Sequence, residues 1–185
     1  MRMDENSTLE PLRARAMEFA HTGIIITDAT DPDNPVIDCN PAFEVVTGYS
    51  RQEVLGRNMR FLQRDKADKD ALTAIRAAIK NQRHVTVVIR NFRKDGSMFW
   101  NELSISPVYD HDGHLTNFIG IQNNVTVRET ARIDLHHQNA ELTQMNLELQ
   151  IKNRQQKDID KRINDLLKQS HSGQMHDSNK QKTDK

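Results

Sequence analysis

VTVVIRNF (residues 85–92), MFWNELSISPV (98–108) and LTNFIGIQNNV (115–125) are the three runs that decide the fold. Apolar and polar residues alternate in each run, which is the period of a β-strand with one buried face. Asp95-Gly96 and Asp112-Gly113 fall between the runs and are hairpin turn signals. The sequence therefore predicts three antiparallel strands joined in a meander.

The segment before these runs adds two strands and several short helices. Residues 23–28 (GIIITD) are rich in β-branched residues, and residues 36–40 fit the second strand of a hairpin. Helices are expected at residues 7–19, with Pro11 in the first turn, at 41–46, after the capping box Ser50-Arg51-Gln52-Glu53, and from Asp68 or Asp70 onward. Two strands, small helices and three long strands indicate an α+β fold.

Three carboxamides point into the predicted core. Asn91, Asn101 and Gln122 each share a strand face with apolar residues two positions away, and the turn at 95–96 places Asn91 nearly opposite Asn101. An unpartnered buried amide costs about 1–3 kcal/mol, so three of them imply a shared polar object. Water and mutual hydrogen bonds are two candidates. The third is a planar ligand whose edge alternates donors and acceptors, such as the pyrimidine edge of a flavin.

The stretch Gly56-Arg57-Asn58-Met59-Arg60-Phe61-Leu62-Gln63 resembles a known signature. It is similar to Gly-x-Asn-Cys-Arg-Phe-Leu-Gln, the flavin-binding helix of the LOV family, which is the blue-light-sensing branch of the PAS domains. The phrases RNFRKDG (90–96), FWNEL (99–103) and GIQ (120–122) also match the family. The resemblance covers about residues 20–125. It implies a PAS/LOV fold, with a five-stranded antiparallel sheet, short helices, an N-terminal cap helix and a long C-terminal helix.

The resemblance also implies a cofactor and the residues that hold it. Its cofactor is a flavin, and Arg60 and Arg76 match the family's phosphate-binding pair, which points to FMN, although FAD stays open. Asn58, Gln63, Asn91, Asn101 and Gln122 match residues that contact the ring or the ribityl chain. The walls of the ring site would be Ile25, Thr27, Leu62, Ile75, Ile89, Leu103 and Phe118, each of which can also be read as ordinary core packing.

Met59 stands where the family has its reactive cysteine. In the family, that thiol bonds to the photoexcited flavin and N5 of the ring becomes protonated. A thioether has no proton to lose, so Met59 is expected to form no such adduct. Cys39 lies on the second predicted strand, where the family has no reactive residue, and is interpreted as a small packed side chain.

Two functions follow from this substitution. The first is a blue-light photoreceptor that signals by flavin photoreduction to a neutral semiquinone, with N5 protonation and reorientation of Gln122 coupled to the C-terminal helix. Trp100, Tyr49 and Tyr109 are candidate electron donors, although Trp100 also fits a packed aromatic role. The alternative is a photochemically silent fluorescent flavoprotein, engineered from cysteine to methionine or natural, or a flavin redox sensor.

The C-terminal part of the chain has a different pattern. Leu135, Leu142 and Leu149 are seven residues apart and Ile163 keeps the phase, while Met145, Ile159 and Leu166 fall three residues after such positions. This seam has faults at Gln138, Lys152 and Gln156, and predicts either a homodimer through the N- and C-terminal helices or one helix docked on its own domain. The expected divisions are 1–21 (cap helix), 22–126 (flavin-binding core), 127–168 (helix) and 169–185 (disordered tail).

Composition excludes several other classes. The 26 basic and 26 acidic residues cancel, so no nucleic-acid or membrane partner is expected. One cysteine and no apolar run of about 18 residues favour the cytoplasm. The sequence shows no nucleophile–base pair, metal-ligand cluster or glycine-rich phosphate loop, and its histidines are scattered, so no enzyme activity and no metal are predicted.

Overall fold

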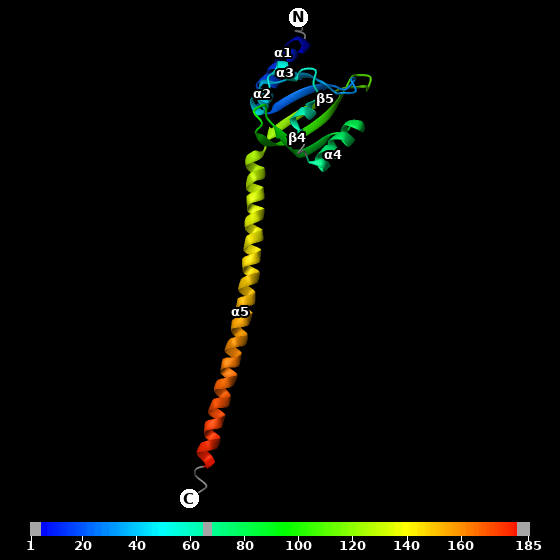
Figure 1. Ribbon diagram of the computed structural model, residues 1–185. Coiled ribbons are helices and arrows are strands. Elements are labelled where there is room, and N and C mark those ends of the chain that lie inside the picture. Colours follow the sequence, from blue (N-terminus) through cyan, green and yellow to red (C-terminus); the bar gives the residue numbers. More distant parts are fainter. Residues whose placement is uncertain (1–4, 65–67, 181–185) are drawn as a thin grey trace. The chain divides into compact units, whose positions relative to one another are not determined.

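The structure is a computed structural model that describes residues 5–64 and 68–180, with the side chains of residues 5–10, 13 and 169–180 left out of the description. Its centre is a five-stranded antiparallel sheet in the order β2-β1-β5-β4-β3 (Figure 1). The strands are β1 (Gly23–Asp28), β2 (Val36–Cys39), β3 (Val85–Phe92), β4 (Met98–Tyr109) and β5 (Leu115–Asn124). This confirms the predicted α+β fold.

The three long strands form the predicted meander. β3 pairs with β4 and β4 with β5, both antiparallel. Gly96 and Gly113 have φ values of +90° and +82°, which suit glycine, so each hairpin turns where the Asp-Gly signal lies. In β3–β4 the facing pairs are Ile89 with Asn101 and Asn91 with Phe99. Asn91 and Asn101 are therefore diagonal neighbours two residues out of register, because five residues rather than a two-residue turn separate the strands.

The first strand, β1, lies inside the sheet rather than at its edge. β1 pairs with β2 on one side and with β5 on the other, and Gly23 faces Gln122. The beginning of β1 and the end of β5 are therefore neighbours. Because Gly23, Ile25 and Thr27 are buried and alternate with half-buried residues, β1 presents one face to the core.

Short helices contribute residues opposite one face of the sheet. They are α2 (Pro41–Thr47), α3 (Arg51–Val54), the 3-10 helix η1 (Met59–Leu62) and α4 (Lys69–Lys80). Asn40 caps α2 by accepting from the Phe43 N–H, and Asp68 caps α4 by accepting from the Asp70 N–H. In the predicted capping box, the Glu53 carboxylate accepts from the Ser50 N–H and hydroxyl.

The core has two clusters of buried side chains. One is made by Ile25, Val36, Cys39, Phe43, Val54 and Leu62, and the other by Ile75, Ile89, Ile105 and Phe118. The first joins β1 and β2 to α2, α3 and η1. The second joins α4 to the meander, so η1 and α4 are each anchored on an apolar base.

Two helices flank this domain in the sequence. α1 (Glu5–Glu18) begins earlier than expected, because residues 5–10 contain no helix breaker, and Pro11 therefore lies inside the helix rather than in its first turn. Leu12 and Phe19 are exposed. α5 (Thr126–Lys180) begins at the predicted place but extends beyond residue 168.

The predicted tail at residues 169–185 differs from what the structure shows. Up to Lys180 the chain stays helical, because the segment has a single glycine and no proline to end a helix already formed. Residues 181–185 lie outside the described part. Residues 1–130 and 131–185 form two separate compact units. Among the described residues, none of the helices combines the length and hydropathy that a bilayer crossing needs.

Candidate functional site

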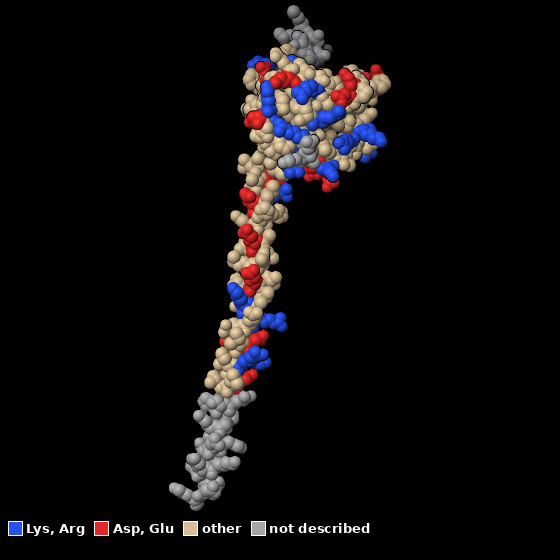
Figure 2. Space-filling view, in the orientation of Figure 1, with Lys and Arg blue, Asp and Glu red and all other residues tan. Residues whose placement is uncertain are grey.

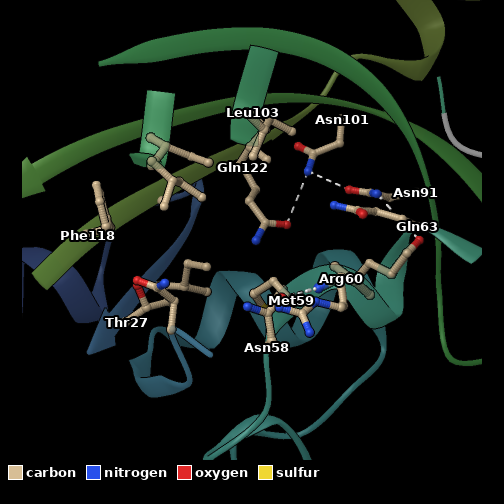
Figure 3. A pocket seen from close by; sticks show the side chains of 17 residues that line it. Thr27, Asn58, Met59, Arg60, Gln63, Asn91, Asn101, Leu103, Phe118 and Gln122 are labelled. Atoms are coloured by element: carbon tan, nitrogen blue, oxygen red, sulfur yellow. Dashed lines mark hydrogen bonds between the residues drawn. The ribbon is translucent and has the colours of Figure 1, made fainter. Parts of the chain in front are cut away.

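A cavity lies between the inner face of the sheet and the helices η1 and α4 (Figure 3). Of the thirteen predicted site residues, eleven line it: Thr27, Asn58, Met59, Arg60, Leu62, Gln63, Asn91, Asn101, Leu103, Phe118 and Gln122. Ile25 and Ile75 line it as predicted, and Asn34, Ile79, Ile105 and Gly120 are additional.

Ile89 does not line the cavity. Its side chain is fully buried in the cluster with Ile75, Ile105 and Phe118. Of the two roles predicted for Ile89, the structure shows ordinary core packing. Strand parity gives the face on which a residue lies, but not how deeply neighbouring side chains cover it.

The three predicted amides meet at one wall of the cavity. Asn101 Nδ2 donates to Asn91 Oδ1 at 2.8 Å and to Gln122 Oε1 at 3.3 Å (Figure 3). All three residues are at most 3% exposed. Asn91 Nδ2 donates in turn to the carbonyl oxygens of Leu62 and Arg90. The wall is a connected polar surface within an apolar core.

This polar wall is incompletely satisfied. Asn101 Oδ1 is buried and has no hydrogen-bond partner, and Gln122 Nε2 donates to no described residue. Asn40, also buried, differs: its Oδ1 accepts from two backbone N–H groups and its Nδ2 donates to the carbonyls of Met17 and Thr22. Because an orphaned buried acceptor is costly, the Asn101 oxygen indicates a donor that comes from outside the chain.

Met59 begins η1 at the opposite side of the cavity. Asn58 caps this helix by accepting from the Arg60 N–H at 2.9 Å, and the Met59 side chain is half-buried against the first core cluster. Its thioether offers neither an acidic proton nor a thiolate. The position that faces the amide wall therefore carries an inert sulfur.

Cations surround an open cleft that adjoins the cavity. Arg60, Arg64, Arg76 and Lys80 line this cleft, together with Gln63 and Asn58, which also line the cavity. Arg60 pairs with Asp33 at 2.8 Å, while Arg76 forms no ion pair with a described residue. The predicted guanidinium pair, Arg60 and Arg76, thus lies in the cleft at one opening of the cavity. Sequence reasoning missed Arg64 and Lys80 because neither belongs to a motif.

The turn before β2 closes over this mouth. Besides the Asp33–Arg60 ion pair, the Asp33 carbonyl accepts from Asn58 Nδ2. Asn34 lines both the cavity and the cleft, has a left-handed backbone with φ of +50°, and buries an Oδ1 with no partner. The run Asp31-Pro32-Asp33-Asn34-Pro35 is a turn signal in the sequence but does not indicate a ligand contact. Asn34 is therefore a second residue that lines the cavity and has a buried polar atom without a hydrogen-bond partner.

Cys39 is not in the cavity. It is 6% exposed in the first core cluster, and burial, with Glu44 and Asp38 nearby, raises the pKa of its thiol to about 11. A thiol with this pKa is protonated at neutral pH and is a poor nucleophile. Cys39 therefore supplies no reactive thiol to the cavity.

The aromatic residues differ in their relation to the site. Tyr49 packs edge-on against Phe61, at 4.9 Å between ring centroids, in the cluster that includes Met59. Trp100 precedes Asn101 on β4 and so points to the other face of the sheet, where Arg90 lies 5.8 Å from its ring. Tyr109 is exposed and donates to the Gln82 carbonyl.

One group of metal-binding residue types occurs in the described part of the chain. Asp110, Asp112 and His114 bring ligand atoms within 4.8 Å of one another, all exposed. Asp110 accepts from the N–H groups of Asp112 and His114, which fixes the β4–β5 turn. Turn formation accounts for this cluster.

Comparison with known proteins identifies the class of this domain. Residues 21–127, more than half of the chain, match the PAS domain family. The chain therefore belongs to the PAS domain family.

Solved structures narrow this to one branch. The LOV domain of a blue-light activated histidine kinase from Erythrobacter litoralis is 43% identical, with a TM-score of 0.55, and the match covers 96% of that chain and 57% of this one. An RNA-binding light-oxygen-voltage receptor is also 43% identical, with a TM-score of 0.69, covering 76% of this chain and 40% of that chain. Within the PAS family this chain is a LOV domain, as the η1 motif indicated.

Curated relatives are longer than the matched region. The blue-light photoreceptor of Listeria monocytogenes is 41% identical over 131 residues, which are 71% of this chain and 51% of that protein. The bacterioopsin transcriptional activator of Halobacterium salinarum is 42% identical over 134 residues, which are 72% of this chain and 20% of that protein. The chain thus spans about half or less of these relatives.

The residues of the cavity fit the flavin that the LOV family implies. The unsatisfied amide oxygen of Asn101 and the amide N–H of Gln122, which donates to no described residue, would suit a ring edge that both donates and accepts. Apolar side chains from β1, β4, β5 and α4 line the cavity, and the cationic cleft beside it would suit a terminal phosphate.

Proposed function

We propose that this domain binds flavin mononucleotide and senses blue light without a cysteine beside the ring. One observation carries the proposal: the buried amides of Asn91, Asn101 and Gln122 line the cavity opposite Met59, and the Asn101 oxygen has no hydrogen-bond partner among the described residues. Bound flavin supplies absorption of blue light and one-electron chemistry. The similarity to blue-light photoreceptors supports the same function.

The cavity residues divide the task of binding. Asn91, Asn101 and Gln122 orient the polar edge of the ring, and Leu62, Leu103 and Phe118 pack on its faces. Gln63 and Asn58 lie between the cavity and the cleft, where a ribityl chain would pass. Arg60 and Arg76 hold the phosphate with forked, charge-assisted hydrogen bonds, supported by Arg64.

Gln122 provides a route from the cavity to α5. Its amide can donate through Nε2 or, after rotation, accept through Oε1, so a change in protonation at the facing atom favours one orientation over the other. Thr126, the first residue of α5, follows closely. Its hydroxyl accepts from the Trp100 N–H at 3.0 Å and donates to Asn124 at 2.6 Å, which couples the start of the helix to β4 and β5.

Tyr49 is the best-placed electron donor among the three aromatic candidates. It belongs to the cluster that contains Met59, whereas Trp100 points to the opposite face of the sheet. With no thiol present, a one-electron path needs such a donor or an external reductant. The alternative, a fluorescent flavin-binding module without a light response, has the same cavity and differs only in this step.

Absorption spectra before and after blue light test the proposal. We expect a flavin band in the purified protein, no reversible bleaching in the absence of reductant, and lasting bleaching under anaerobic light with reductant. The Met59→Cys variant should gain bleaching that recovers in the dark, because a thiol then lies beside the ring. Unchanged spectra with bright fluorescence under all conditions would support the silent alternative, and colourless protein that takes up no FMN would refute flavin binding.

A further inference from the structure

Met59 is chemically distinct among the side chains that line the cavity. Singlet oxygen attacks the side chains of Met, Cys, His, Trp and Tyr far faster than all others, and converts Met to its sulfoxide. Of the described residues that line the cavity, Met59 is the one member of these types. Cys39 and Tyr49 belong to the first core cluster and do not line the cavity. An oxidant formed inside the cavity therefore meets the Met59 sulfur before any other reactive side chain of the described residues.

The sulfur of Met59 is open to small molecules. Its side chain is half-buried, whereas the core cluster on which it packs is buried. Figure 3 shows Met59 across the cavity from Gln122. Asn58, Arg60 and Gln63 line both the cavity and the open cleft, which gives dissolved oxygen a way in from solvent. Because molecular oxygen is small and uncharged, the cations of the cleft neither attract nor repel it.

Oxidation of a thioether needs no proton on sulfur, so the feature that prevents adduct formation does not protect Met59. This inference rests on the flavin binding proposed above, because bound flavin supplies the absorption of blue light. With no thiol beside the ring, the absorbed energy can pass to dissolved oxygen and give singlet oxygen, without transfer of electrons. The net reaction at Met59 is then thioether plus oxygen plus water to sulfoxide plus hydrogen peroxide. Sulfur loses two electrons, oxygen gains two, one S–O bond forms, and both protons of the water end on the peroxide.

We propose that Met59 is an oxidation site, at which blue light and oxygen convert the thioether to the sulfoxide. The product is a polar, chiral group in a position that packs against apolar side chains. A polar oxygen without a donor costs free energy there, so the oxidised protein should hold flavin less firmly. Thiol-dependent reductases reverse the change, since two thiols become a disulfide and the sulfoxide oxygen leaves as water. The site would thus keep a record of illumination until it is reduced.

Other methionines of the chain are matched controls. Met17 is half-buried like Met59 but does not line the cavity. Met98 and Met145 are 42% and 58% exposed, and Met145 belongs to α5, where uncharged side chains lie open between acidic and basic ones (Figure 2). Peroxide added in the dark should oxidise methionines in order of exposure, Met98 and Met145 first. Blue light in air should reverse this order and oxidise Met59 first, because the oxidant forms inside the cavity.

Peptide mass spectrometry of the full flavin-loaded chain measures the gain of one oxygen atom at each methionine against light dose. We expect the gain at Met59 to precede the gains at Met17, Met98 and Met145, and to disappear when oxygen is removed. Oxidation of Met98 and Met145 ahead of Met59 in the light, or an unchanged Met59 in light and air, overturns the inference, while the yellow colour of the same sample upholds flavin binding. Colourless protein that takes up no FMN refutes flavin binding and this inference with it.

The Met59→Leu variant tests the effect of the sulfoxide on binding, because leucine has a similar volume and no sulfur. After illumination in air, the parent protein should retain less flavin on gel filtration than its own dark sample. Treatment with methionine sulfoxide reductase and fresh FMN should restore the dark value. Met59→Leu should retain as much flavin after illumination as its own dark sample does. An equal light-dependent loss in both proteins would show that oxidation of Met59 does not loosen the flavin.

Discussion

Asn101 is the residue on which the proposed binding site depends. Its amide nitrogen links Asn91 to Gln122, while its oxygen has no partner in the described part of the chain. Many buried amides serve only to satisfy backbone groups, as Asn40 does. Asn101 is different because it lines a cavity and its oxygen has no described partner.

Replacing Asn101 by Leu should weaken flavin binding at least tenfold, about 1.4 kcal/mol, because the ring edge loses a buried hydrogen-bond partner. Fluorescence titration of the unloaded protein with FMN measures this change. Asn123→Leu is the control, since residue 123 lies on the same region of the sheet but on the other face. Equal affinities for the two variants would show that the amide wall is not a ligand site.

Gly120 limits the space of the cavity in another way. A Cβ added there would lie 2.8 Å from Cγ1 and 3.0 Å from Cδ1 of Ile25, which is closer than real Cβ atoms approach. Gly120→Ala should push Ile25 into the cavity, lower flavin occupancy and destabilise the fold by about 1–3 kcal/mol. Flavin-to-protein absorbance ratio and urea denaturation measure the two effects. The double variant Gly120→Ala with Ile25→Val should regain flavin if the clash is the cause, and no recovery would contradict this.

At the residue scale, the sequence predicted the amides but not that Asn34 and Arg64 would line the site. Asn91, Asn101 and Gln122 follow from strict alternation along strands, which places side chains without knowledge of distant neighbours. Asn34 and Arg64 lie in irregular segments, where no period tells which way a side chain points. Their positive φ values of 50° and 45° depend on contacts that form only in the folded chain.

Among the elements, α3 and the β3–β4 turn are joined by an ion pair. Glu53 Oε1 accepts from Lys94 Nζ at 2.6 Å, and hydrogen bonds from Lys94 and Ser50 lower the pKa of Glu53 to about 2. Its unfolded value is near 4.3. The folded state therefore gains stability from this carboxylate above about pH 4.3 and loses it as the pH falls toward 2.

Glu53→Gln should lower the melting temperature at pH 7, and the difference from the parent protein should shrink steadily between pH 5 and pH 2. Thermal melts across this pH range check the result. Lys94→Met should produce the same trend, and the double variant should add little more, because the two residues act through one contact. A difference that stays constant with pH would show that the pKa of Glu53 is not lowered in the folded state.

Element boundaries were predictable where residues have local reasons to start or stop. β3 matches the predicted run at both ends, and the Asp-Gly signals mark both turns of the meander. The diagonal offset of Asn91 and Asn101 was not predictable from the Asp95-Gly96 signal, since the loop has five residues. The ends of α1 and α5 were misjudged because polar composition was read as irregular structure, although neither segment contains a residue that stops the helix.

For the whole molecule, the central question is whether α5 joins two chains. Leu142 lies on the seam and Leu147 lies at an f position away from it, and the two are 56% and 58% exposed. The homodimer predicted from the seam should become a monomer in the Leu142→Asp variant at micromolar concentration, because a charge in the seam must be desolvated. Leu147→Asp should leave the dimer unchanged.

Sedimentation velocity of the two variants beside the parent protein measures the effect. Dissociation by Leu147→Asp, or dimers in both variants, would place the interface elsewhere. The position of β1 between β2 and β5 was not predictable from the sequence, since pairing between residues about 100 positions apart has no local signature.

The pairing of Gly23 with Gln122 has a consequence for how the domain can be used. The chain enters the domain at the start of β1 and leaves it at the end of β5, and these two strands are hydrogen-bonded neighbours. The LOV fold can therefore be inserted into a surface loop of a host protein without spreading the ends of that loop. A host joined at these two points would receive any twist of the central strands at both splice sites together. For such a chimera, short rigid junctions at residues 22 and 125 should transmit the most of this twist to the host protein, and flexible glycine junctions should transmit the least.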